Sequence, residues 1–231
     1  MKAERTGFRG FPKEATAFFV GLEADNSKAY WEAHKEVYLG AVRGPMELLI
    51  TSVEKKYQPF KIYRPYRDVR FSKNKSPYKT QTGAWSEGPE GGGWYVQLGA
   101  SGLMVAAGYY LMQRDQIARY REAVAGDAGA ALAREVRKLE SAGITIFGGG
   151  EAPLKRVPKE YPTDHPRGEL LKLKGLVAMR EFGEPRWLRT AEVVARVEGF
   201  WKETAALQRW LDRHVGASRE LPPGAREFIG G

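Results

Sequence analysis

Apolar residues recur every three or four positions through the first quarter of the chain, which is the period of an amphipathic helix. Residues 12–22 open with a proline and an early acid, as helices commonly do. A second helix is expected over residues 28–39, with Asn26 or Ser27 as its cap, and a third from Pro45. The first quarter is therefore predicted to be helical.

The pattern then changes from a helical period to alternation. Pro65 is incompatible with a regular helix, and residues 68–72 alternate polar and apolar as in a half-buried strand. Residues 94–98 and 103–109 are strand candidates joined by a four-residue turn, which predicts a hairpin. The glycine-rich stretch 83–93 is expected to be a mobile loop.

The second half of the chain mixes helical and short extended patterns. Its expected helices are 115–125, 128–141 and 190–214, and its expected strands are 144–147, 154–157 and 176–182. This order favours an α+β fold. We predict one domain over residues 8–218, with N-terminal helices, a central antiparallel sheet and a long C-terminal helix, followed by a tail at 219–231.

Composition supports one folded domain and narrows its chemistry. With 42% hydrophobic and 12% aromatic residues, the 231-residue chain can bury a full core. It contains no cysteine, which removes disulfides, a thiolate nucleophile and cysteine-based metal sites. No apolar run matches a signal peptide or a bilayer span, so we expect a cytoplasmic protein.

Positive charge is concentrated in one segment. The formal net charge is +9, and residues 61–79 hold seven basic residues against one acid, a balance of +6. Such a local excess attracts polyanions. We therefore expect a phosphate-bearing partner, nucleic acid included, and no membrane partner.

The same segment supplies groups that recognise phosphate. Guanidinium groups bind phosphate or carboxylate through paired hydrogen bonds, and tyrosine or phenylalanine rings can stack on bases. The candidate ligand-binding residues are Arg64, Arg67, Arg70, Lys73, Lys75, Tyr78 and Lys79. In a regular strand, alternation would send Arg67 and Lys73 to one face and Arg64 and Arg70 to the other. Alternatively, Arg67 lies beside apolar neighbours and pairs with a buried acid.

A second candidate site surrounds His165. It stands between Asp164 and Arg167 in a proline-rich loop, and an imidazole suits acid–base chemistry near neutral pH. We consider His165, or Asp68, as a catalytic acid or base, with Arg167 as a ligand contact. The structural alternative is that His165 caps a helix starting near Arg167.

No metal or cofactor is predicted. The three histidines are widely spaced, and the glycine runs 91–93 and 148–150 match neither a P-loop nor a dinucleotide fingerprint. Trp85 and Trp94 flank the glycine-rich stretch beside the basic segment, so they are candidate ligand contacts. Tryptophans at helical spacing elsewhere are expected in the core.

Several motifs together resemble a known family. They are Gly10-Phe11-Pro12, Asn26-Ser27-Lys28 with Trp31, Arg64 with Arg67 to Lys73, Lys75-Ser76-Pro77-Tyr78-Lys79, and Asp164-His165-Pro166-Arg167. This pattern, over about residues 8–218, resembles the uncharacterised family known as domain of unknown function 2461. The resemblance implies one compact domain in a bacterial and fungal family and carries no activity, cofactor or catalytic residue. The chain departs from the family in having Asn74 where an acid is usual and Asp25 where a second Asn is usual.

Three functions remain open in this order. The first is a binding module for a phosphate-bearing ligand, with RNA, the ribosome included, or a nucleotide foremost. The second is an enzyme acting on a phosphorylated small molecule, with the basic residues as anion clamp and His165 as acid or base. The third is a protein–protein module that uses the 83–93 stretch and Trp85.

Overall fold

The computed structural model describes residues 7–57, 59–68, 70, 75–88 and 90–220, apart from the side chain of Glu87. Its elements are α1 (Lys13–Ala24), α2 (Lys28–Val37), the π-helix η1 (Tyr38–Arg43), α3 (Gly44–Tyr57), β1 (Lys61–Ile62), β2 (Gln81–Glu87), β3 (Gly93–Gly99), β4 (Gly102–Tyr109), α4 (Arg114–Ala125), α5 (Ala128–Ser141), β5 (Thr145–Phe147), α6 (Gly168–Leu171), β6 (Leu176–Gly183), the 3-10 helix η2 (Arg186–Arg189), α7 (Glu192–Glu203) and α8 (Ala205–His214).

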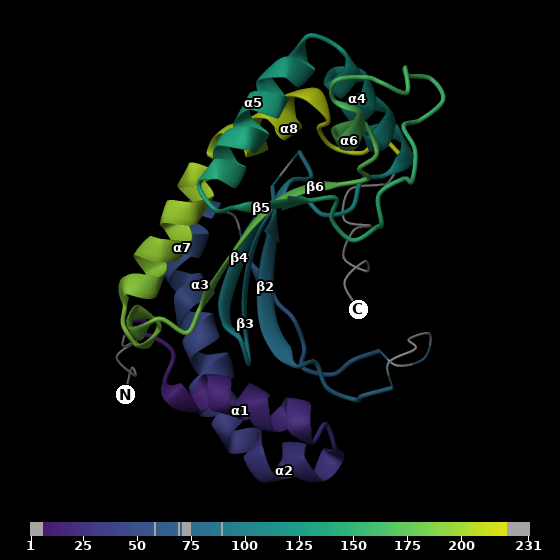
Figure 1. Cartoon of the computed structure of the whole chain (residues 1–231). Coiled ribbons are helices and arrows are strands. Elements are labelled where there is room, and N and C mark those ends of the chain that lie inside the picture. Colours follow the sequence, from purple (N-terminus) through teal and green to yellow (C-terminus); the bar gives the residue numbers. More distant parts are fainter. Residues whose placement is uncertain (1–6, 58, 69, 71–74, 89, 221–231) are drawn as a thin grey trace.

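The strands of the described chain form one antiparallel six-stranded sheet in the order β1-β2-β3-β4-β6-β5. Consecutive strands β2, β3 and β4 make a meander because short turns join them. Helices α3 and α7 lie along one face of the sheet, α1 and α2 lie near one end, and α4, α5, α6 and α8 gather at the other (Figure 1). The predicted α+β domain with a central antiparallel sheet is confirmed.

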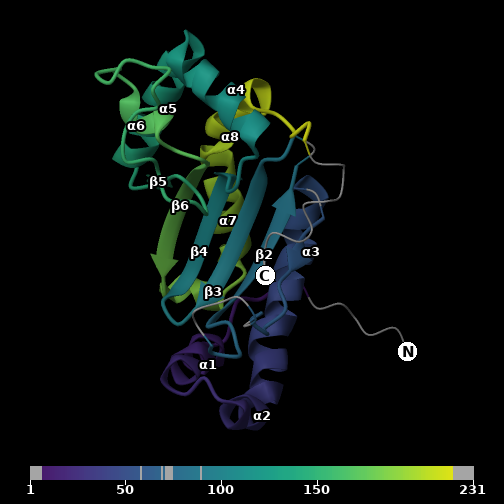
Figure 2. The same cartoon turned by 90° about the vertical axis from the view of Figure 1, so that its right-hand side faces the viewer.

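Alternation along the strands separates a covered face from an open face. Val96 on β3 and its partner Val105 on β4 are completely buried beneath the helices. Their neighbours Tyr95 and Gln97 point to the opposite face and keep part of their surface exposed. Figure 2 looks onto that open face, with α3 and α7 behind the sheet, and no described helix lies across it.

Aromatic side chains fasten the helices to the covered face. Trp201 of α7 is 1% exposed, and its indole Nε1 donates a hydrogen bond to the carbonyl of Ala106 at 3.1 Å. Its ring packs on Tyr57 and Phe60, at centroid distances of 4.7 and 5.5 Å. The core therefore lies between the sheet and the helices α3 and α7.

The predicted N-terminal helices are confirmed, with one difference. The Ser27 hydroxyl caps α2 by accepting the Tyr30 N–H at 3.1 Å. The chain does not break between the second and third helices, because residues 38–43 continue as the π-helix η1 with helical backbone at Gly44. The helices predicted over 115–125 and 128–141 are also confirmed as α4 and α5.

The prediction of a mobile loop over residues 83–93 is wrong. Most of this stretch belongs to β2 and to the start of β3. Two of its glycines are required by close packing. A Cβ at Gly83 would lie 2.4 Å from the Tyr95 hydroxyl oxygen, and one at Gly92 would collide with the Gln208 side chain.

Two other predicted elements differ from the structure. Residues 154–157 form no strand; the Leu154 N–H donates to the Lys172 carbonyl from within a loop. The single helix expected over 190–214 is divided into α7 and α8 at Thr204. There the Oγ1 donates back to the Phe200 carbonyl, and the backbone leaves the helical region (φ −87°, ψ 0°).

The predicted strand at 68–72 lies mostly outside the described residues, which show an isolated bridge between Tyr66 and Tyr78 nearby. The boundary between the domain and a tail at 219 stays a prediction. Ser218 and Arg219 are hydrogen-bonded to Asp115, and residues 221–231 lie outside the described part. None of the described helices has the length and apolar character that a bilayer span requires.

Candidate functional site

The basic segment forms a hairpin-like excursion from the sheet. The Arg67 N–H donates to the Pro77 carbonyl and the Lys79 N–H to the Pro65 carbonyl, both at 2.8 Å. Because proline has no N–H, each proline takes part only as an acceptor. The described parts of this segment, residues 63–68, 70 and 75–80, are called the basic hairpin below; it projects on the open side of the sheet, near α1 (Figure 1).

A clamp from the helices holds the base of the basic hairpin. The Asn26 side chain donates to the Tyr78 carbonyl at 3.1 Å and accepts the Tyr78 N–H at 3.0 Å. The Tyr78 ring stacks on Trp31 at 4.5 Å and is 5% exposed. Tyr78, predicted as a ligand contact, therefore positions the hairpin, and its burial raises the pKa of its hydroxyl. Sequence reasoning missed this role of Asn26.

Three cations of the basic hairpin converge. Burial lowers the pKa of Lys79, and the positive charges of Arg64 and Arg67 lower it further, so both arginines lie within electrostatic range of Lys79. Within the described residues no acid forms an ion pair with any of them. The Nε of Arg67 is buried without a hydrogen-bond partner there, so the expected pairing with a buried acid is not found. We call Arg64, Arg67 and Lys79 the cation cluster.

Asp68 is occupied by its neighbour. The guanidinium of Arg70 donates to both carboxylate oxygens, at 3.0 and 2.7 Å, and the Arg70 N–H donates at 3.1 Å. These side-chain and backbone hydrogen bonds hold the pKa of Asp68 well below its usual range. A carboxylate held this way is a poor base at neutral pH, which argues against a catalytic role for Asp68.

Other predicted residues of the segment have different positions. Lys75 is exposed on the returning side of the hairpin. Lys73 lies outside the described residues, as do Phe71 and Asn74. The regular alternation expected for the segment is interrupted at Pro65, which explains how Arg64 and Arg67 reach the same neighbourhood.

The two predicted tryptophans point to opposite faces of the sheet. Trp85 of β2 lies on the open face, in register with Lys61 on β1 and Tyr95 on β3. Trp94 points to the covered face, where its ring packs edge-on against Tyr57 at 5.6 Å. Only Trp85 therefore shares a surface with the open-face aromatics.

The structure adds residues that sequence reasoning did not select. The Nζ of Lys79 lies 4.9 Å from the centre of the Tyr63 ring, and that ring is 6.4 Å from Tyr95. The Tyr95 hydroxyl donates to Gln97 Oε1 at 2.8 Å. Burial raises the pKa of Tyr63 to about 12. The polar–apolar alternation of residues 94–98 was the signal that could have indicated Tyr95 and Gln97.

His165 and Arg167 directly precede α6, and α6 and α4 lie at the end of the sheet opposite α1 (Figure 1), so the two residues are away from the cation cluster. The His165 Nδ1 accepts the Arg167 N–H at 3.0 Å. The Arg167 guanidinium donates to the carbonyls of Val124 at 2.5 Å, Ala125 at 2.7 Å and Gly126 at 3.1 Å, which ends α4. The fold thus does not bring the predicted acid or base together with the predicted anion clamp.

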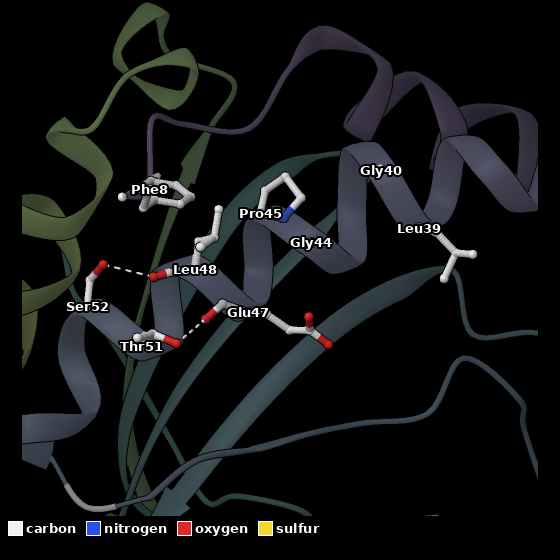
Figure 3. Close-up of a pocket in the computed structure, with 10 residues that line it drawn as sticks. Phe8, Leu39, Gly40, Gly44, Pro45, Glu47, Leu48, Thr51 and Ser52 are labelled. Carbon is white, nitrogen blue, oxygen red and sulfur yellow. Dashed lines mark hydrogen bonds between the residues drawn. The ribbon is translucent and has the colours of Figure 1, made fainter. Parts of the chain in front are cut away.

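A shallow groove of about 560 Å³ runs along the outer side of η1 and α3 next to Phe8 (Figure 3). Its hydroxyls, Thr51 and Ser52, donate to carbonyls of their own helix, and Glu47 is paired with Arg43. No residue of the cation cluster lines it. Among the described residues, no group of three or more potential ligands could hold a metal ion.

Comparison with known proteins bears on the family alone. A family model described as conserved hypothetical protein (DUF2461) matches residues 14–210, which include the Asn26 clamp, the basic hairpin and the sheet. No curated protein matches the chain at a significant level.

Proposed function

This chain belongs to the DUF2461 family of conserved hypothetical proteins, and we propose that it binds a phosphate-bearing ligand, RNA or a nucleotide foremost, through the cation cluster. The proposal rests on one observation. Arg64 and Arg67 both lie close enough to Lys79 to lower its pKa, and no acid among the described residues forms an ion pair with any of the three. Positive charges held close together stabilise the fold poorly, so their arrangement favours an external anion.

The side chains of the cluster suit phosphate in particular. Two guanidinium groups offer paired donors and Lys79 adds a compact charge, which is the combination that binds phosphate oxygens. The Arg67 Nε–H is buried and satisfied by no described group, which marks this arginine as incompletely paired by the protein. An anion at this position would also raise the depressed pKa of Lys79.

Titrations of a fluorescein-labelled single-stranded RNA at two salt concentrations test this function. If three phosphates are contacted, affinity falls about 20-fold between about 50 and about 200 mM salt, from a slope of about 0.7 per contact. In the double variant Arg64→Gln/Lys79→Gln one contact remains, and the loss shrinks to about threefold. Inorganic polyphosphate is expected to compete with the RNA.

Lys155→Gln/Arg156→Gln provides a matched control. It removes the same two kinds of charge from exposed residues in the loop before α6. The control is expected to keep the wild-type salt dependence. The proposal fails if neither RNA nor polyphosphate binds at about 50 mM salt, or if both double variants weaken binding equally.

A further inference from the structure

We infer that the open face of β1, β2 and β3 is a stacking platform for the bases of a single-stranded nucleic acid whose phosphates lie on the cation cluster. This inference rests on the proposed function and adds the class of ligand. It concerns a surface outside the basic hairpin, formed by Lys61, Tyr63, Trp85, Tyr95 and Gln97, which we call the platform.

Strand register places the platform residues in two adjoining rows. Lys61, Trp85 and Tyr95 are partners across β1, β2 and β3. The Tyr63 N–H donates to the Gly83 carbonyl, and Gly83 is the partner of Gln97. Neighbouring strands lie about 4.8 Å apart, so each row presents its groups side by side.

Gly83 gives the platform its shape. Gly83 stands between Tyr63 and Gln97 in the second row and has no side chain, so the Tyr95 hydroxyl can lie over it. A Cβ at Gly83 would be 2.4 Å from the Tyr95 hydroxyl oxygen. Tyr95 can therefore lean toward Gln97 and donate to its Oε1. This leaves the amide NH₂ of Gln97 with no partner among the described residues, as a donor for the edge of a base.

Trp85 has the properties of a ligand-stacking residue. Its ring is partly exposed, and in the described chain it makes no ring contact with another aromatic side chain. Its indole N–H donates to no described group, and the atom is not buried. By contrast, Trp94 packs on Tyr57, and Trp201 donates to a backbone carbonyl.

The platform is continuous with the cation cluster. Lys79 contacts the Tyr63 ring, Tyr63 contacts Tyr95, and Tyr95 is the register partner of Trp85. At the other side of the sheet, the exposed Glu181 on β6 would repel a phosphate backbone. The Glu181 carboxylate thus disfavours a polyanion over β6.

This combination selects among polyanions. Side-by-side aromatic rings on an open sheet face, next to unpaired cations, bind unstacked bases in single strands. A duplex keeps its bases stacked inside and cannot use the rings. Inorganic polyphosphate and acidic peptides have no base to place on Trp85, so they would use the cations alone.

Fluorescence anisotropy on the full chain tests the inference. The labelled probes are a single-stranded RNA and an abasic oligonucleotide of equal length, and inorganic polyphosphate is measured as an unlabelled competitor. Trp85→Leu keeps apolar bulk but removes the stacking ring, and Trp85→Phe restores a ring. We expect Trp85→Leu to weaken RNA binding at least about fivefold, and Trp85→Phe to recover most of it. Binding of the abasic probe and of polyphosphate should change less than about twofold in either variant.

The outcomes separate this inference from the proposed function. If RNA and the abasic probe bind equally and Trp85→Leu changes neither, the platform is overturned, while Arg64→Gln/Lys79→Gln still tests the cation cluster. Equal losses for RNA and polyphosphate in Trp85→Leu also overturn stacking. Poly-glutamate serves as a model of an acidic protein partner. If it binds and Trp85→Leu abolishes that binding, while RNA does not bind, the inference is wrong. If no probe binds, the proposed function itself fails.

Discussion

The Asn26 clamp offers the sharpest test of how the basic hairpin is held in place. Asn26→Ala removes two hydrogen bonds to the main chain of Tyr78, of 3.0 and 3.1 Å. Each is worth about 1 kcal/mol, so we expect a loss of at least about 2 kcal/mol. The Trp31–Tyr78 stack remains and adds about 0.5–1.5 kcal/mol, which keeps the hairpin loosely attached.

Urea unfolding followed by circular dichroism measures the effect. With a slope of about 2 kcal/mol/M, the midpoint should fall by about 1 M with an unchanged slope. RNA affinity should fall as well, because the cation cluster loses its fixed position. Ser27→Ala is the neighbouring control: it removes the α2 cap, costs about 1 kcal/mol and leaves RNA affinity intact. A change below about 0.5 kcal/mol in Asn26→Ala would refute the clamp.

Three further predictions follow from the other end of the fold. Arg167→Met removes the donors to three carbonyls at the end of α4 and should lower stability by about 2–4 kcal/mol, seen as a lower Tm; an unchanged Tm contradicts this. His165→Ala should lower stability by about 1 kcal/mol, and His165→Asn by less, because an Asn oxygen can accept the same Arg167 N–H. RNA affinity should be unchanged in both variants; a variant that keeps its stability but loses RNA binding would show that His165 takes part in ligand binding. Burial raises the pKa of Asp115, but hydrogen bonds, from the Arg219 N–H foremost, lower it to about 2 overall. The lowered pKa of Asp115 stabilises the folded state by at most about 1 kcal/mol after solvent screening. This stabilisation is present above the unfolded-state pKa of 3.8 and is lost as pH falls toward 2. In Asp115→Asn, the free energy of unfolding measured in urea should therefore vary less with pH over that range.

Local patterns in the sequence determined most of the elements. The helical period located α1, α2, α4 and α5, and alternation with a short turn located the β3–β4 hairpin. These signals are local because a helix or a hairpin is completed by residues close in the chain. The basic segment was likewise visible as charge, and three of its predicted ligand residues form the cation cluster.

Tertiary structure decided which residues share a surface. Trp85 and Trp94 are the same residue type at the two sides of one glycine-rich stretch, yet the pairing of β2 with β3 places Trp85 on the open face and Trp94 beneath the helices. The glycines of 83–93 suggested a loop, but their purpose depends on Tyr95 and Gln208, which approach them only in the folded chain.

The same holds for the charged groups. Arg167 and Arg64 are both basic residues in proline-containing stretches, but Arg167 donates to the carbonyls at the end of α4, whereas Arg64 forms no ion pair with any described acid. A sequence states which charges a chain carries. Whether each is neutralised depends on contacts between residues distant in the chain, and these exist only once the helices have packed on the sheet.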